Sequence, residues 1–280
     1  MPIVLSGYHI REILSSSLNQ PLVVSLDLGL SQSEIMITET LQFPDGQELS
    51  REKLERNFKK KKLTDCFLID NNELFFLSTF NHETNTSYKL YEPQIDWPPT
   101  LSINGSFMHT IVTATPLEEA THKVNALDPT FGIVLETCMG LGYCTKMMLK
   151  TVVDKIITCE ISEEVIHLAK INPWSKDIFY HKRIEINHID VSKYVHKKES
   201  EFVNFILHDP PTLHRVGELY SEGFYSQLYR ILKKKGKLYH YIGTETEKTK
   251  HRYKKGVINR LYSAGFSRVE SSYRGVVAYK

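Results

Sequence analysis

The sequence has few cysteines and no long apolar run, and both absences exclude classes of protein. The four cysteines, Cys66, Cys138, Cys144 and Cys159, form no C-x-x-C pair and have no histidine at metal-ligand spacing. We therefore expect reduced, mostly buried thiols, with neither a zinc site nor a disulfide framework. No stretch of about 18 or more apolar residues occurs, so the sequence predicts no membrane-spanning helix.

Targeting signals and a strong charge bias are missing as well. The N-terminus, Met-Pro-Ile-Val-Leu-Ser-Gly-Tyr, lacks the basic patch and cleavage region of a signal peptide, so we expect a cytoplasmic protein that binds no membrane. A formal net charge of +2 over 280 residues is too small for a dedicated nucleic-acid binder. The content of 41% hydrophobic and 24% charged residues predicts a globular protein with a hydrophobic core. The same composition is compatible with an oligomer.

From about residue 125 onward, short apolar runs alternate with amphipathic stretches, which is typical of a parallel α/β sheet. Strands are expected at residues 132–136, 155–160, 184–189, 202–208 and 237–242. Helices are expected at residues 145–153, 163–171, 192–197, 221–232 and 254–264. Residues 267–280 have the pattern of a terminal hairpin on the sheet edge.

The first hundred residues have a different pattern. Short strands are expected at 22–28, 34–40, 66–69, 74–77 and 87–91. Turn sequences such as Pro44-Asp45-Gly46 and Asn71-Asn72 separate them, and Trp97-Pro98-Pro99 is typical of a linker. We predict a small β-rich domain over 1–100, a linker and cofactor-covering segment over 101–125, and an α/β domain over 126–280.

A glycine-containing segment, Glu136-x-Cys138-x-Gly140-x-Gly142, connects the first expected strand of that domain to a helix. Its glycines allow a tight turn and a close approach of the backbone to a ligand. A dinucleotide site would have a third glycine three residues after Gly142, but position 145 is threonine. The segment therefore favours a nucleoside with a charged amino-acid tail over a dinucleotide; a plain strand-to-helix turn is the alternative.

Carboxylates follow the next two expected strands. Glu160, 18 residues beyond Gly142, could accept both hydroxyls of a ribose, or it could be a charge at the start of a helix. Asp190 could accept the exocyclic amine of an adenine, or it could cap a helix.

The fourth expected strand leads into His208-Asp209-Pro210-Pro211. Two prolines make the turn rigid, and ligands of parallel sheets bind beyond the carboxyl ends of the strands. Asp209 offers an acceptor for a proton from an amine, which suits a nucleophilic nitrogen. The alternative is an ordinary Asp-Pro turn, with His208 as a hydrogen-bonded structural residue.

The glycine segment, the acidic strand ends and the Asp-Pro-Pro turn together resemble class I S-adenosylmethionine-dependent methyltransferases over about residues 108–280. Several unusual strings more closely resemble a family of predicted archaeal methyltransferases, whose members are similar to spermidine synthases. The strings are Thr115-Pro-Leu-Glu-Glu119, Leu135-Glu-Thr-Cys-Met-Gly-Leu-Gly-Tyr143, Leu168-Ala-Lys-Ile-Asn-Pro-Trp174, His208-Asp-Pro-Pro211, Gly217-Glu-Leu-Tyr-Ser221 and Phe224-Tyr225.

This resemblance implies a Rossmann-like class I methyltransferase sheet with helices on both faces, S-adenosylmethionine as cofactor and no metal. The implied cofactor-binding residues are Glu136, Cys138, Gly140, Gly142, Glu160, Ile161, Asp190, Val191 and Asp209. The implied catalytic residues are Asp209 and His208, and the implied substrate-binding residues are Pro210, Pro211, His109, Glu218 and Tyr220. Position 212 is Thr, where enzymes that methylate amino groups of nucleic acids commonly have an aromatic residue; a flipped base is therefore less well supported.

Three functions remain open. The first is methyl transfer to a nitrogen of RNA or of a small amine, with Asp209 or His208 receiving or orienting the departing proton. The second is aminopropyl transfer from decarboxylated S-adenosylmethionine to a polyamine, for which Glu118, Glu218 and Glu222 offer carboxylates. The third is a nucleic-acid-binding module, because basic runs occur at 59–62 and 248–255, where Tyr253 could stack on a base.

Overall fold

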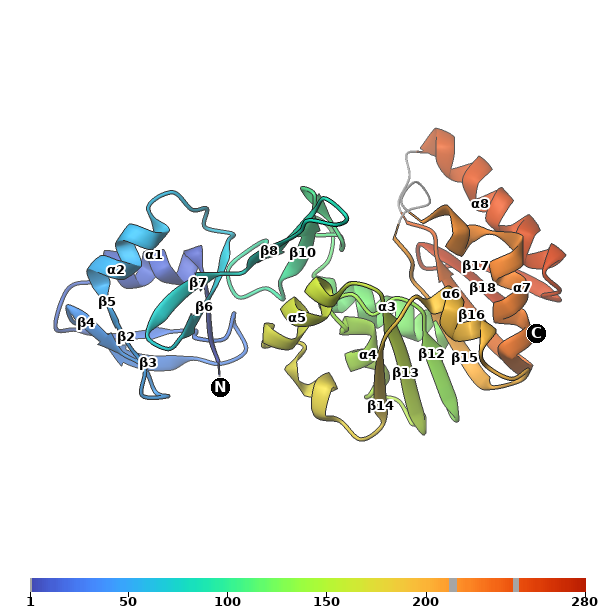
Figure 1. Ribbon diagram of the computed structural model, residues 1–280, viewed down its shortest axis with the longest axis horizontal. Helices are drawn as coiled ribbons and strands as arrows, with labels where there is room; N and C mark the ends of the chain where they lie inside the picture. The colour runs from blue at the N-terminus through green and yellow to red at the C-terminus, as the bar shows by residue number, and fades with distance from the viewer. Residues whose placement is uncertain (1, 212–215, 244–246) are drawn as a thin grey trace. The chain divides into compact units, whose positions relative to one another are not determined.

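The computed structural model describes residues 2–211, 216–243 and 247–280, and only the backbone of 247–252 (Figure 1). The chain forms two compact units: Met1–Pro116 with Glu164–Lys176, and Leu117–Glu163 with Asp177–Lys280. We call them the N-terminal unit and the C-terminal unit. The expected linker over 101–125 is not a linker throughout, because strands β10 (Thr100–Ile103) and β11 (Ser106–Phe107) belong to the N-terminal unit.

The C-terminal unit contains a seven-stranded sheet in the order β14-β13-β12-β15-β16-β18-β17. Its strands are β12 (Ile133–Glu136), β13 (Lys155–Glu160), β14 (Ile184–His188), β15 (Val203–His208), β16 (Leu232–Tyr241), β17 (Arg268–Ser272) and β18 (Gly275–Tyr279). The first five are parallel, and β18 pairs antiparallel with β16 and β17. This confirms the predicted α/β sheet with a terminal hairpin at its edge.

Helices and apolar side chains cover this sheet. The helices that follow the N-terminal sheets in sequence are α3 (Pro116–Leu127), α4 (Tyr143–Met148), α5 (Glu163–Ile171), α6 (Val191–His196), α7 (Glu222–Ile231) and α8 (Glu247–Ser263), with 3₁₀ turns η1 (Lys176–Tyr180) and η2 (Gly217–Tyr220). One core packs α6, α7 and α8 against β12, β13, β15, β16 and β18 (Figure 1). The neighbours Val134 and Leu135 of β12 point to opposite faces and are both 0% exposed, so both faces are covered.

The N-terminal unit is built from small antiparallel sheets and two helices. Its sheets have the orders β1-β6-β7 and β11-β10-β9-β8, with the hairpins β2-β3 and β4-β5. The strands not yet bounded are β1 (Ile3–Ser6), β2 (Pro21–Val24), β3 (Ser33–Met36), β4 (Thr40–Gln42), β5 (Glu48–Ser50), β6 (Cys66–Asp70), β7 (Glu73–Phe76), β8 (Ser78–Asn81) and β9 (Thr86–Tyr91). The β-rich prediction holds, but the sequence did not predict helices α1 (Gly7–Ser15) and α2 (Arg51–Phe58). The Ser50 hydroxyl caps α2 by accepting from the Lys53 backbone N–H at 3.2 Å.

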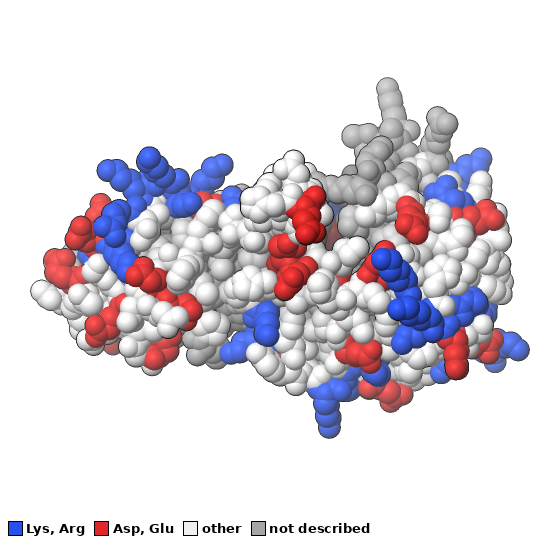
Figure 2. Space-filling model, in the orientation of Figure 1, with Lys and Arg blue, Asp and Glu red and all other residues white. Residues whose placement is uncertain are grey.

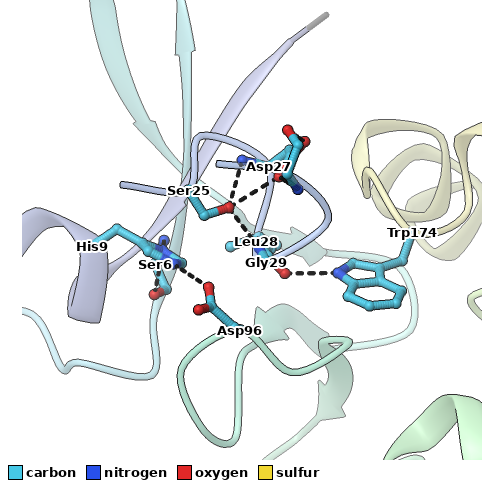
Figure 3. A network of polar contacts seen from close by, with 9 residues as sticks. Ser6, His9, Ser25, Asp27, Leu28, Gly29, Asp96 and Trp174 are labelled. Carbon is cyan, nitrogen blue, oxygen red and sulfur yellow. Dashed lines mark hydrogen bonds and ion pairs between the residues drawn. The ribbon is translucent and has the colours of Figure 1, made fainter. Parts of the chain in front are cut away.

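Segment 164–176 is held to the N-terminal unit by its tryptophan. Trp174 donates from Nε1 to the carbonyl oxygen of Leu28 at 2.8 Å (Figure 3). The turn that carries Leu28 is itself fixed, because the Ser25 hydroxyl oxygen accepts from the Gly29 backbone N–H at 2.7 Å. Trp174 therefore connects two parts of the chain that are far apart in the sequence.

The described residues contain neither a membrane-spanning helix nor a cluster of metal ligands. No helix there is both long enough and apolar enough to span a lipid bilayer. The same residues contain no group of three or more His, Cys, Asp or Glu side chains that could hold a metal ion. All four cysteines are free thiols, and Cys66, Cys144 and Cys159 are buried.

Candidate functional site

The candidate site lies in the C-terminal unit, where the adjacent strands β12 and β15 end. The chain runs from β12 toward one edge of the sheet and then returns to β15 on the other side, so these two strands form the topological switch point. Just beyond them, the Thr137 hydroxyl and His208 Nδ1 are 2.8 Å apart. Ligands of open parallel sheets bind at this place, beyond the carboxyl ends of the strands.

The glycine segment folds into a turn that only glycine accommodates well. Gly140 and Gly142 have φ angles of 55° and 76°, in the left-handed region that side chains with a Cβ disfavour. A Cβ at Gly142 would also come within 2.2 Å of Cδ1 of Ile178. The backbone of this turn is thus free of side chains at both glycines.

Glu160, at the end of β13, is bonded to this turn. Its Oε2 accepts from the backbone N–H of Gly140 at 3.0 Å, and its Oε1 accepts from Ile161 N at 2.9 Å and Ser162 N at 3.0 Å. Burial raises the pKa of the Glu160 carboxyl, while the three N–H donors oppose the rise. A carboxylate has about four acceptor positions, so acceptor capacity remains for a ligand hydroxyl.

Glu136 points inward beneath the turn. Its Oε2 accepts from the hydroxyls of Thr145 and Thr158, the latter at 2.6 Å. Thr145 occupies the position where a dinucleotide site would have its third glycine, and here it holds this carboxylate. Burial raises the pKa of Glu136 to about 7, against the effect of both hydroxyls.

The other predicted cofactor-binding residues differ in exposure. Asp190 caps α6, since its Oδ1 accepts from Ser192 N at 2.8 Å, and the next residue, Val191, is buried in the core. Ile161, which follows Glu160, is 66% exposed. Cys138 lies half-buried in the glycine segment, and burial raises the pKa of its thiol well above the usual value.

His208 is completely buried, and protein groups contact both of its ring nitrogens. Nε2 lies 3.0 Å from the carbonyl oxygen of Leu219, to which it donates, so Nδ1 accepts from the Thr137 hydroxyl. Burial lowers the pKa of His208 to about 3, although the Leu219 carbonyl raises it. The imidazole is therefore neutral at physiological pH.

Asp209 pairs with a lysine that the sequence analysis did not single out. Lys123 Nζ on α3 lies 2.7 Å from Asp209 Oδ2, and the lysine side chain is only 4% exposed. Burial alone would lower the pKa of Lys123, but the Asp209 carboxylate outweighs it and raises the pKa above the usual range. Its only sequence signal is its place four residues after Glu119 on a helix.

A buried network surrounds this pair. Glu119, 0% exposed, lies with its Oε1 4.0 Å from Lys123 Nζ. The same oxygen accepts from the Tyr241 hydroxyl at 3.1 Å and lies 3.4 Å from NH1 of Arg274. Lys123 Nζ is also 4.0 Å from the centre of the Tyr241 ring. Two cations and two carboxylates thus balance one another.

The predicted substrate-binding residues are divided between the two units. The Tyr220 hydroxyl donates to the Pro211 carbonyl oxygen at 3.0 Å, which braces the turn after Pro210. Glu218 is exposed. His109 belongs to the N-terminal unit, where its Nδ1 lies 2.9 Å from the Thr100 hydroxyl. Thr212 lies outside the described residues.

This chain is similar to a known protein over nearly its whole length. No family model matches it. It is 35% identical over 280 residues to the uncharacterized protein MJ1233 of Methanocaldococcus jannaschii, covering 96% of this chain and 93% of that protein. The spermidine synthase of Thermotoga maritima aligns with a TM-score of 0.53 at 19% identity, covering 75% of each chain. That likeness shows a shared fold.

A second solved structure is more distant. Trm1 from Pyrococcus horikoshii, in complex with S-adenosyl-L-methionine, aligns with a TM-score of 0.44 at 17% identity and covers 59% of this chain and 54% of its own. A score this low supports no argument about the site.

Proposed function

The chain belongs to the family of the Methanocaldococcus jannaschii protein MJ1233, and we propose that it transfers a methyl group from S-adenosylmethionine to a nitrogen atom. The hydrogen bond from Gly140 N to Glu160 Oε2 carries the proposal. It joins a turn whose two glycines carry no side chain to the carboxylate at the end of β13, the strand next to β12, and these are the two parts that a nucleoside cofactor needs.

These residues fit S-adenosylmethionine. Gly140 and Gly142 let the cofactor approach the backbone, and the remaining acceptor capacity of Glu160 suits the ribose hydroxyls. Ile161 offers an exposed apolar side chain directly after Glu160, and the adenine base of the cofactor can pack against it. Asp190 uses Oδ1 as a helix cap and has a second carboxylate oxygen for the adenine amine.

When bound, S-adenosylmethionine supplies a methyl group on a sulfonium, which leaves as a neutral thioether and keeps the electron pair of the broken C–S bond. The nitrogen of the acceptor uses its lone pair to form the new C–N bond and then loses a proton. The Asp209 carboxylate is the group that accepts this proton; burial raises its pKa, and the Lys123 ammonium beside it opposes the rise. His208 holds the strand end through both ring nitrogens, so we assign it a positioning role.

Aminopropyl transfer to a polyamine remains the second candidate, because the chain shares its fold with a spermidine synthase over 75% of its length. A polyamine needs several carboxylates whose charge is not already balanced. Glu118, Glu218 and Glu222 are exposed to solvent, so they do not form a buried carboxylate lining. The carboxylates of Asp209 and Glu119 are already paired with Lys123 and Arg274 respectively. The charges of the site therefore favour methyl transfer.

Exposed basic residues of the N-terminal unit favour RNA as the acceptor of the methyl group. Lysines 59–62 are all exposed, and they follow α2 along an edge of that unit where Figure 2 shows basic side chains gathered. Lys61 Nζ lies 3.9 Å from the centre of the Phe76 ring. Basic residues beside aromatic rings are suited to contact phosphates and bases.

Calorimetric titration of the full chain with S-adenosylmethionine and with its decarboxylated form tests the proposal. We expect the intact cofactor to bind more tightly, and Gly142→Val to abolish binding by placing a side chain in the turn. The exposed Gly46, which a Cβ would not crowd, gives the control substitution Gly46→Asn. Tighter binding of the decarboxylated form would favour aminopropyl transfer, and binding of neither would count against both reactions and for a pure binding module.

A further inference from the structure

We propose that Lys123 selects the acceptor by balancing the charge of Asp209, so that the site takes an uncharged nitrogen, as in an amide or a nucleobase, and rejects an alkylammonium group. The proposal rests on the methyl-transfer function above and narrows its substrate class. Helix α3 buries Lys123 and Glu119 beside the apolar residues Ala120, Val124 and Leu127.

The geometry shows that Lys123 acts on Asp209 directly. Nζ and Oδ2 are 2.7 Å apart, and the aspartate side chain is 21% exposed while the lysine is 4% exposed. Asp209 can thus be reached from outside the core, whereas its cation is held from the inner side. The negative charge of Asp209 is therefore already paired with Lys123 when a ligand contacts this carboxylate.

The neighbouring groups leave no spare negative charge. Glu119 contacts Lys123 at 4.0 Å and Arg274 at 3.4 Å, and it accepts from the Tyr241 hydroxyl. The aromatic face of Tyr241 lies over the lysine ammonium as well. An incoming ammonium group would therefore be desolvated without gaining a carboxylate of its own.

Reactivity leads to the same class of acceptor. A nitrogen attacks through its lone pair, and an alkylammonium has none until it loses a proton, with a pKa of about 10.4 for a lysine-like amine. Burial raises the pKa of Asp209 and the Lys123 ammonium opposes the rise, but a carboxylate remains a much weaker base than such an amine and does not remove that proton. An amide or nucleobase nitrogen starts uncharged and becomes strongly acidic only once the C–N bond forms, when Asp209 can accept its proton.

Binding of a diamine probe to four forms of the full-length protein tests the proposal. Titration with 1,4-diaminobutane is expected to show no binding at millimolar concentration for the wild type and for Lys123→Arg, which keeps the charge. Lys123→Met frees the Asp209 carboxylate and should bind the diamine at least tenfold more tightly. The double variant Lys123→Met/Asp209→Asn removes that carboxylate and should lose the gain.

Thermal unfolding measures the folding of each variant, and a separate titration measures the binding of S-adenosylmethionine. If Lys123→Met does not fold, as judged by thermal unfolding, then Lys123→Gln replaces it, because glutamine keeps a donor for Asp209 but not the charge. Tight diamine binding by the wild type, or no gain in a folded uncharged variant, would overturn the proposal. Titration of the same wild type with S-adenosylmethionine tests the proposed function itself, so that failure of one is distinguished from failure of the other.

Discussion

Gly140 donates its backbone N–H to Glu160 Oε2 at 3.0 Å, and together with the bond from Met139 N to the Cys159 carbonyl oxygen at 2.8 Å it joins the turn after β12 to the end of β13. Because the same carboxylate also accepts from two backbone groups of its own loop, its orientation is fixed before any ligand binds. A preorganised carboxylate of this kind binds hydroxyl groups without first losing side-chain freedom.

We therefore expect Glu160→Gln to weaken binding of S-adenosylmethionine by about tenfold or more, or about 1.4 kcal/mol. The amide has only one acceptor oxygen, so it cannot serve all three backbone donors and a ribose. Isothermal titration calorimetry measures the change, and the exposed Glu163→Gln is the matched control. Equal affinity of Glu160→Gln and the wild type would contradict the ribose assignment.

Asp209→Asn should destabilise the protein by about 3 kcal/mol, because it leaves the Lys123 ammonium buried without its partner. The double variant Lys123→Met/Asp209→Asn removes both charges and should recover most of this loss. Urea unfolding of the wild type, both single variants and the double variant measures the coupling between the two residues. Strictly additive effects would show that the pair does not interact.

Glu92, in the N-terminal unit, makes stability depend on pH. It is 0% exposed, and burial raises its pKa to about 8. A pKa above the unfolded value means that the folded state holds the proton. Stability from this group is fully present below the unfolded pKa of about 4.5 and is lost as pH rises through 8, by up to about 5 kcal/mol.

Glu92→Gln mimics the protonated acid and should remove that pH dependence. We expect the variant to be more stable than the wild type at pH 9 and close to it at pH 5, as measured by chemical unfolding at the two pH values. Glu52→Gln, at an exposed carboxylate of α2, should leave the profile unchanged. A wild type that gains stability from pH 5 to pH 9 would be the opposite of this expectation.

The RNA proposal predicts a salt-dependent effect of the exposed lysines after α2. Lys60→Glu/Lys62→Glu should weaken binding of a single-stranded RNA by about tenfold or more and reduce the slope of log affinity against log salt by about 2. Fluorescence anisotropy at several salt concentrations measures both quantities. Lys193→Glu/Lys197→Glu, on α6 and at its C-cap, makes the same change of charge at exposed positions of the other unit, and an equal effect there would rule out a specific RNA surface.

Periodicity predicted several elements after residue 125 well. The expected strand 155–160 and helix 163–171 have the bounds of β13 and α5, because an apolar run ends at a carboxylate and an amphipathic stretch begins just after it. Asp190 shows the limit of such reasoning, since a residue at that place can cap a helix and contact a ligand at once, and the cap is what the structure shows.

The N-terminal helices and Lys123 were harder to predict, for different physical reasons. Helix α2 is mostly charged and buries only Leu54, so it has too few apolar residues to show a helical periodicity. Lysine is almost never fully buried unless it is paired, and the partner of Lys123 is 86 residues away in the sequence. Only the folded chain brings the two together.

The hydrogen bond from Trp174 to Leu28 limits how this protein can be shortened. Residues 164–176 lie between strands of the C-terminal unit in the sequence, yet they are part of the N-terminal unit. A fragment of residues 117–280 would keep every strand of the large sheet but leave an indole N–H and the segment around it without their native contacts. Neither unit is one continuous stretch of chain, so a single cut between residues 116 and 117 would not separate them.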